Sequence, residues 1–339
     1  MNTVLAAEWA PQRAVMLTWP RPDGDFGHIF ESVESNFFGI ARAIAEFEPL
    51  HINCEQDKET LQKRLIENGV PAERVQLYQL PNNDVWARDH GPITVFRKDK
   101  PVLLDFQFNG WGGKFEHTRD NALNTALASQ GAWHAPLQSI DFVLEGGAIE
   151  SDGQGTLLTT ERCLLAPTRN PAMNREQVEH LLMTTFGLRR VLWLKHGDLL
   201  GDDTDGHIDT LARFCDPHSI AYQSCDDTSD PHFEALAAMR RELEAFRTPD
   251  GRPYKLIALP LPDPIYDQAG QRLPAGYANF LITNGAVLVP AYDVAQDAAA
   301  LKILSESFPD RKVMAVDCRY LIHQYGSLHC VTMQLPCGP

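Results

Sequence analysis

Three residues have side chains suited to proton transfer and nucleophilic attack. His207 and Asp209 lie in the polar stretch Gly201–Asp209, just before an apolar segment. If both residues begin a strand, its period of two places them on one face, where an imidazole beside a carboxylate can transfer protons. Cys330 begins the apolar segment Cys330–Gln334, and its thiol is a nucleophile if its pKa falls from about 8.5. A polar turn before a strand and a buried inert thiol explain the same residues structurally.

Two further carboxylates lie in separate short polar segments of the sequence. Asp89 belongs to the stretch Trp86–Pro92, where it follows Arg88, and such Arg-Asp pairs are often structural. Glu145 precedes two glycines, which let the backbone approach closely, as in a loop that lines a pocket. Turn geometry explains these glycines equally well.

The acidic stretch Gly201–Asp209 lacks the ligand spacing of a metal site. Aligning Gly206 with the glycine of a calcium-binding loop places Ala212 where a glutamate is required. The chain contains no His-Glu-x-x-His zinc sequence, no Gly-rich dinucleotide loop and no Walker motif. We therefore expect neither a metal nor an organic cofactor.

The elements that must position these residues recur along the chain. Two segments share the order strand, proline, amphipathic helix, basic turn and apolar strand: Cys163–Leu194 and Ala286–Val316. The strands are expected at Cys163–Pro167 and Ala286–Pro290. Within the first copy, Asn174 is a plausible N-cap for a helix over residues 174–186, with Gln177 at the third helical position. A shared order of this kind indicates an internal repeat.

Fainter copies begin near Val15, Ile93 and Ile208, which predicts five β-β-α-β modules in an α/β protein. An additional helix and strand are expected between the first two copies, at residues 58–67 and 75–80. Modules that each bury one face gain most by surrounding a common axis, and the strand Cys330–Gln334 can close such a ring against Val15–Trp19. An open α/β sheet has the same alternation and is the alternative.

Composition and charge narrow the class of protein. The 339 residues include 30 basic and 45 acidic side chains, for a formal net charge of −15. This balance argues against a nucleic-acid-binding protein and suits a small cationic partner. We find neither a membrane-spanning apolar run nor the basic and apolar start of a secretory signal. The seven scattered cysteines lack a C-x-x-C pair and indicate reduced thiols in the cytoplasm.

Taken together, these polar segments resemble the sequence motifs of the agmatine deiminase / bacterial peptidylarginine deiminase family of the guanidine-modifying (pentein) superfamily. The matching motifs occur in the family's order: Trp86–Pro92, Phe108–Gly113, Leu144–Gly147, Gly201–Asp209, Tyr277–Phe280 and Leu328–Thr332. The resemblance implies a five-bladed, pseudo-symmetric α/β propeller of ββαβ modules around a central active-site channel. It also implies a single catalytic domain over residues 1–339.

The resemblance implies a role for each candidate residue. Cys330 is expected to be the nucleophile that attacks the guanidinium carbon, and His207 the general acid/base. Asp89 and Asp209 are expected to bind the guanidinium nitrogens, while Glu145 orients His207. Two carboxylates can hold a planar guanidinium by charge-assisted hydrogen bonds, and the bound cation favours a nearby thiolate.

The implied reaction is hydrolytic loss of ammonia, which converts agmatine to N-carbamoylputrescine in polyamine (putrescine) biosynthesis. The alternative substrate is peptide arginine, which would become citrulline. A third hypothesis is a non-catalytic ring protein that binds a macromolecule through its surface. This third hypothesis is disfavoured, because the chain contains all four candidate catalytic residues: Cys330, His207, Asp89 and Asp209.

Three tryptophans are candidates for contact with the alkyl chain of a substrate: Trp19, Trp86 and Trp111. Each is equally suited to a structural core. Homo-oligomers are common among soluble proteins, so we also expect self-association.

Overall fold

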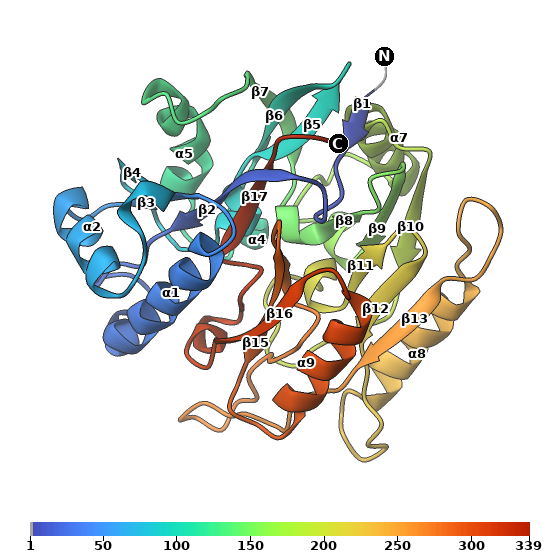
Figure 1. The fold of residues 1–339 in the computed structure, drawn as a ribbon. Coiled ribbons are helices and arrows are strands. Elements are labelled where there is room, and N and C mark those ends of the chain that lie inside the picture. Colours follow the sequence, from blue (N-terminus) through green and yellow to red (C-terminus); the bar gives the residue numbers. More distant parts are fainter. Residues whose placement is uncertain (1–2) are drawn as a thin grey trace.

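The computed structural model describes residues 3–339, and Met1 and Asn2 lie outside the described residues. The strands form five small sheets, which Figure 1 shows arranged around the middle of the molecule with the long helices outside them. Within residues 3–339, no helix combines the length and apolar character required to cross a membrane.

One unit of two antiparallel strands, a helix and a parallel strand recurs in all five sheets. In the fourth sheet, β11 (Ala212–Asp216) pairs antiparallel with β12 (Ser219–Gln223), and α8 (Phe233–Ala245) leads to the parallel strand β13 (Lys255–Leu259). The predicted ββαβ module is therefore confirmed. The second, third and fifth units consist of β5 (Ile93–Arg97), β6 (Lys100–Gln107), α5 (Thr118–Ser129) and β7 (Leu137–Val143); β8 (Ile149–Ser151), β9 (Thr156–Thr160), α7 (Arg175–Phe186) and β10 (Arg190–Leu194); and β14 (Leu281–Ile282), β15 (Ala286–Ala291), α9 (Gln296–Ser307) and β16 (Lys312–Asp317).

The two ends of the chain meet in the remaining sheet. Here β17 (Thr332–Pro336) pairs antiparallel with β2 (Gln12–Thr18), which confirms the predicted closure of the last strand against the first. The other elements of this unit are α1 (Phe30–Ala45), β3 (Leu50–Cys54), α2 (Lys58–Glu67) and β4 (Val75–Gln79), and they include the predicted additional helix and strand. The single domain over residues 1–339 stays a prediction.

The segment before β2 links two neighbouring sheets. β1 (Thr3–Leu5) pairs antiparallel with β5 in the second sheet, whereas β2 belongs to the first. Residues 6–11 therefore cross between the two sheets and carry Glu8, which is 5 % exposed, into the interior.

In the third unit, the strand predicted at Cys163–Pro167 is wrong. The strand is β9, and the chain then turns through the short helix α6 (Glu161–Leu164). The hydroxyl of Thr160 caps this turn by accepting a hydrogen bond from the backbone N–H of Cys163 at 3.3 Å. The predicted helix that follows is confirmed as α7, with the Asn174–Gln177 capping box in place.

Two predicted strand starts also differ from the structure. The residues after His207 form a single 3₁₀ turn, η4 (Ile208–Thr210), so β11 begins only at Ala212. Cys330 precedes β17, because a turn closed by a hydrogen bond from the N–H of Thr332 to the carbonyl of His329 comes first. Both chemically important segments are therefore turns rather than strand ends.

Candidate active site

Three short helical turns in the interior bring the predicted residues together. α3 (Ala87–His90) carries Asp89 and packs against η3 (Gly146–Ala148), which in turn packs against η4. A Cβ atom on Gly147 would lie 2.5 Å from His207 Nδ1, 2.9 Å from Asp89 Oδ1 and 3.2 Å from Asp209 Oδ2. The three functional groups thus surround a glycine whose missing side chain makes room for them.

Asp89 is buried and has specific partners for both carboxylate oxygens. Its Oδ2 accepts a hydrogen bond from the indole N–H of Trp111 at 2.9 Å, and its Oδ1 accepts one from the N–H of Gly147 at 3.1 Å. His207 Nδ1 lies 3.6 Å from the same Oδ1. Burial raises the pKa of Asp89 to about 6, with the charge of His207 opposing this shift and that of Asp209 adding to it.

Asp209 is fully buried, and its two oxygens differ. Oδ2 lies 2.7 Å from His329 Nδ1, whereas Oδ1 has no hydrogen-bond partner within residues 3–339. Burial alone would raise the pKa of Asp209, but the hydrogen bond and charge of His329, together with the charge of His207, hold it below the usual value. The carboxylate is therefore charged and has one oxygen available.

The sulfur of Cys330 faces two polar side chains. Asn279 places Nδ2 and Oδ1 3.3 and 3.5 Å from Sγ, and Asp209 Oδ2 lies 3.8 Å away. Burial raises the pKa of Cys330 well above its usual range, and the negative charges of Asp209 and Asp89 raise it further. Without a bound cation, the neutral thiol is therefore favoured at physiological pH.

His207 lies between acidic groups in a dry environment. Burial opposes its charge, but Asp89, Cys163 and Glu145 outweigh this effect and raise the pKa of His207 well above its usual value. Neither ring nitrogen has a hydrogen-bond partner among the described residues. The imidazolium form is therefore favoured at neutral pH.

Glu145 pairs with a residue that the sequence did not point to. Arg169 Nε donates to one carboxylate oxygen at 3.0 Å, and the other oxygen has no hydrogen-bond partner in the described part of the chain. Donor atoms of Glu145, Cys163 and His207 lie within 4.8 Å of one another, close enough to hold a metal ion. Because the Arg169 guanidinium already neutralises Glu145, this cluster is better suited to holding His207 than to binding a cation.

A cavity of about 360 Å³ reaches Cys330 and Asp89. The indoles of Trp86 and Trp111 line the cavity. Three further carboxyl groups line it, those of Asp25, Asp84 and Asp203, and none of its lining residues is basic. Trp19 instead lies in the core, where its indole N–H donates to Glu34 at 3.1 Å. Of the three candidate tryptophans, two therefore face the cavity.

Several residues of this centre escaped the sequence analysis. Asn279 and His329 lie inside motifs that were recognised, but their types gave no reason to assign them a contact. Arg169 and Cys163 lie outside those motifs, and Glu8 is hundreds of positions from its partner His329. Glu8, Asn279 and His329 share one signal, a polar or ionisable side chain within an otherwise apolar stretch, and Arg169 lacks it.

Five small α/β sheets around a buried cysteine, histidine and two aspartates are the fold and site of the guanidine-modifying (pentein) class, and the deiminase relatives of this chain make it a hydrolase that acts on C–N bonds. Comparison with known proteins agrees with this assignment. Residues 4–336 match the family described as Porphyromonas-type peptidyl-arginine deiminase, and the chain belongs to that family.

Individual relatives cover nearly the whole chain. A structure from Porphyromonas gingivalis is 48 % identical over 98 % of both chains, with a TM-score of 0.92. A substrate-bound agmatine deiminase from C. jejuni is 35 % identical over 99 % of this chain and 97 % of its own, also with a TM-score of 0.92. The agmatine deiminase of Stutzerimonas stutzeri is 32 % identical, and the match covers 98 % of this chain and 95 % of that protein.

We expect Gly147→Ala to lower the rate of ammonia release by about 100-fold or more, because a displacement of about 1 Å in a reacting group has this effect. The added methyl would push His207 and Asp89 apart. Steady-state kinetics and a thermal melt on the same preparation would separate this effect from unfolding. Gly39→Ala is the control, since a Cβ there meets nothing within 4 Å. An unchanged rate in Gly147→Ala would contradict the tight grouping around this glycine.

Proposed function

We propose that this chain hydrolyses the guanidinium group of agmatine to N-carbamoylputrescine and ammonia. The observation that carries the proposal is the cavity that joins Cys330 and Asp89 to the carboxyl groups of Asp25, Asp84 and Asp203. These three groups are called the acidic mouth. Relatives named agmatine deiminase, at 32–34 % identity over nearly the whole chain, support the same substrate.

Asp89 and Asp209 bind the guanidinium in this proposal. Asp209 Oδ1 is buried without a hydrogen-bond partner in residues 3–339, and a buried acceptor without a partner costs about 1–3 kcal/mol. A guanidinium N–H would supply the missing donor. The two carboxylates would then fix the plane of the cation by charge-assisted hydrogen bonds.

The bound cation offsets the two carboxylate charges that hold the Cys330 thiol neutral, so the thiol loses its proton to the solvent and the thiolate attacks the guanidinium carbon. The Sγ–C bond forms, His207 donates a proton to one nitrogen, and ammonia leaves as the C–N bond breaks. A water deprotonated by His207 then adds to the thiouronium carbon and expels the thiolate, leaving a ureido group. Glu145, paired with Arg169, supports the charge and position of His207.

The acidic mouth supports agmatine over free arginine. The ammonium of agmatine can approach the carboxyl groups of Asp25, Asp84 and Asp203, whereas the α-carboxylate of arginine would meet these carboxyl groups without a basic partner among the lining residues. Burial raises the pKa of Asp84 to about 8, and the charges of Asp25 and Asp120 add to the shift. Burial and the charge of Asp202 raise the pKa of Asp203 to about 7.

Peptide arginine is the second candidate substrate, because the matched family is described as a peptidyl-arginine deiminase. A peptide lacks the terminal ammonium and would extend beyond the mouth of the cavity.

We infer a reducing, cytoplasmic setting from seven cysteines that are all free thiols in the structure. Homo-oligomerisation and the place in polyamine biosynthesis stay predictions.

We expect wild-type protein to release ammonia from agmatine, and Cys330→Ala to abolish this activity without loss of the fold. Free arginine and an arginine-containing peptide are the comparison substrates, with ammonia and ureido product both measured. Cys318→Ala is the matched control, because it removes another buried thiol that does not line the cavity. Turnover of the peptide alone would select the second candidate, and an active Cys330→Ala would overturn the nucleophile assignment.

We also expect KM for agmatine to fall as pH rises from about 6.5 to 8.5, because Asp84 and Asp203 ionise across this range and then attract the ammonium. Butylguanidine, which lacks the ammonium, shares all pH effects on Cys330 and His207 but not this one. The ratio of the two KM values, measured against pH, therefore reports only the effect of the mouth carboxyl groups on binding of the ammonium. Asp84→Asn should flatten this ratio, and an unchanged ratio in that variant would exclude Asp84 from binding the substrate tail.

A further inference from the structure

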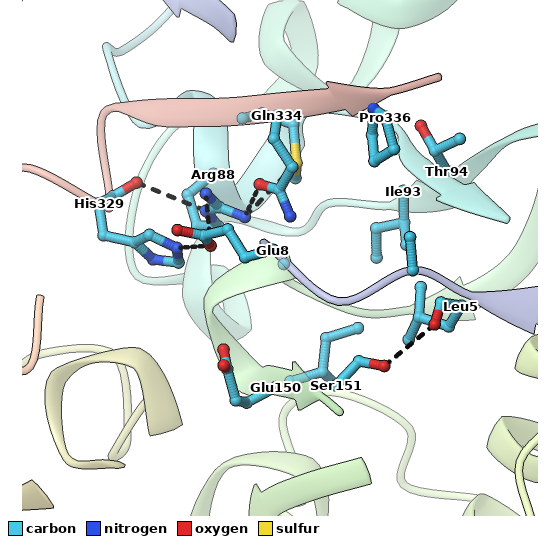
Figure 2. Close-up of a pocket in the computed structure, with 14 residues that line it drawn as sticks. Leu5, Glu8, Arg88, Ile93, Thr94, Glu150, Ser151, His329, Gln334 and Pro336 are labelled. Carbon is cyan, nitrogen blue, oxygen red and sulfur yellow. Dashed lines mark hydrogen bonds and ion pairs between the residues drawn. The ribbon is translucent and has the colours of Figure 1, made fainter. Parts of the chain in front are cut away.

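His329, next to Cys330 in the chain, lies between two buried carboxylates. Its Nδ1 is 2.7 Å from Asp209 Oδ2, and its Nε2 is 2.6 Å from Glu8 Oε2. The His329 side chain is 2 % exposed. Figure 2 shows its ring directed at the carboxylate of Glu8, which also faces Arg88.

The other partners of Glu8 are all donors. Arg213 Nη2 and the N–H of Ile282 each lie 2.7 Å from its oxygens, and Arg88 Nη2 lies 3.7 Å away. Burial alone would raise the pKa of Glu8, but Arg213 and His329 outweigh it and hold this pKa far below its usual value. Glu8 is therefore an ionised acceptor, as is Asp209.

An imidazole between two ionised acceptors must donate from both nitrogens. A neutral ring has one N–H and would leave a lone pair 2.6–2.7 Å from a carboxylate oxygen. The two contacts therefore fit a ring that donates from both nitrogens.

His329 does not face the cavity that contains Cys330. It lines a second cavity of about 510 Å³, together with Glu8, Arg88 and Glu150. Arg88 and His329 are the chain neighbours of Asp89 and Cys330, so this second cavity lies directly behind the layer of reacting groups. The His329 ring therefore reaches the substrate-binding groups through its contact with Asp209.

We propose that His329 is a positioning residue, a buried imidazolium anchored by Glu8 that keeps Asp209 ionised and turned so that Oδ1 is free for the guanidinium. This proposal rests on the proposed function, because it assigns the task of Asp209 to substrate binding. The charged groups that face His329 are Asp209 from η4, Glu8 from the crossing segment, Arg88 from α3, and Arg213 from β11 with its partner Glu150 from β8. The first two contact its ring.

The test combines a direct observation of the ring with kinetics. Nitrogen NMR of ¹⁵N-histidine-labelled wild-type protein at neutral pH should show two buried histidines protonated on both nitrogens, His207 and His329. The test concerns the signal of His329. That signal should disappear in His329→Gln and move in Glu8→Gln, so either variant identifies it if the other fails to fold. A His329 signal with a single protonated nitrogen would overturn the proposal, and this readout requires no turnover.

The kinetic arm uses agmatine over a range of pH. His329→Gln should raise KM by about 10- to 100-fold with a smaller change in kcat, which is the range for loss of a charge-assisted hydrogen bond. The acid limb of kcat/KM should also move to higher pH, because Asp209 loses the partner that lowers its pKa. His90→Gln is the matched control: His90 is equally buried, and its ring contacts the Thr18 hydroxyl rather than a carboxylate.

The two arms separate failure of this proposal from failure of the proposed function. An unchanged KM and acid limb in folded His329→Gln would overturn the positioning role. A wild-type protein without activity on agmatine would overturn the proposed substrate, and the NMR arm would then still decide the state of His329.

Discussion

The rest of this structure depends on the pairing of buried charges. Transfer of an isolated ion from water into a protein interior costs several kcal/mol, so each charge near the centre requires a partner of opposite sign or a donor. Asp209, His329, Glu8 and Arg213 meet this requirement as a chain of alternating charges. Glu145 meets it with Arg169. Asp209 Oδ1 is the point where this chain leaves an acceptor free, and a cationic substrate can complete it.

The same constraint explains why the residues that carry chemistry lie on short turns rather than on strands. A strand commits its backbone N–H and C=O groups to neighbours in a sheet. The turns α3, η3 and η4 instead leave groups such as the Gly147 N–H to bind Asp89. Gly147 also supplies the space into which His207 and both aspartates converge. The five sheets form the rigid surroundings, and the turns inside them supply the contacts.

The ring closure also has a consequence for the site. Pairing of β17 with β2 fixes the segment just before it, which contains His329 and Cys330. The crossing segment between β1 and β2 brings Glu8 to the same place from the opposite end of the chain. Residues more than 300 positions apart therefore meet in one buried ion pair, and the fold and the charge state of the centre depend on each other.

The sequence by itself determined the modular elements of the fold and pointed to the candidate site residues. Hydrophobic periodicity depends on neighbours within a few positions, so the ββαβ repeat, the capping box at Asn174 and the additional helix and strand were predictable. The family resemblance pointed to Asp89, Glu145, His207, Asp209 and Cys330, because residue type and spacing alone left a structural explanation open for each of them. Only the tertiary structure decided which polar groups became partners: Glu145 with Arg169, Asn279 with Cys330, and His329 with Glu8. It also decided that Trp19 lies in the core and that His207 and Cys330 lie on turns. These outcomes depend on burial and on contacts between distant segments, which local patterns do not encode.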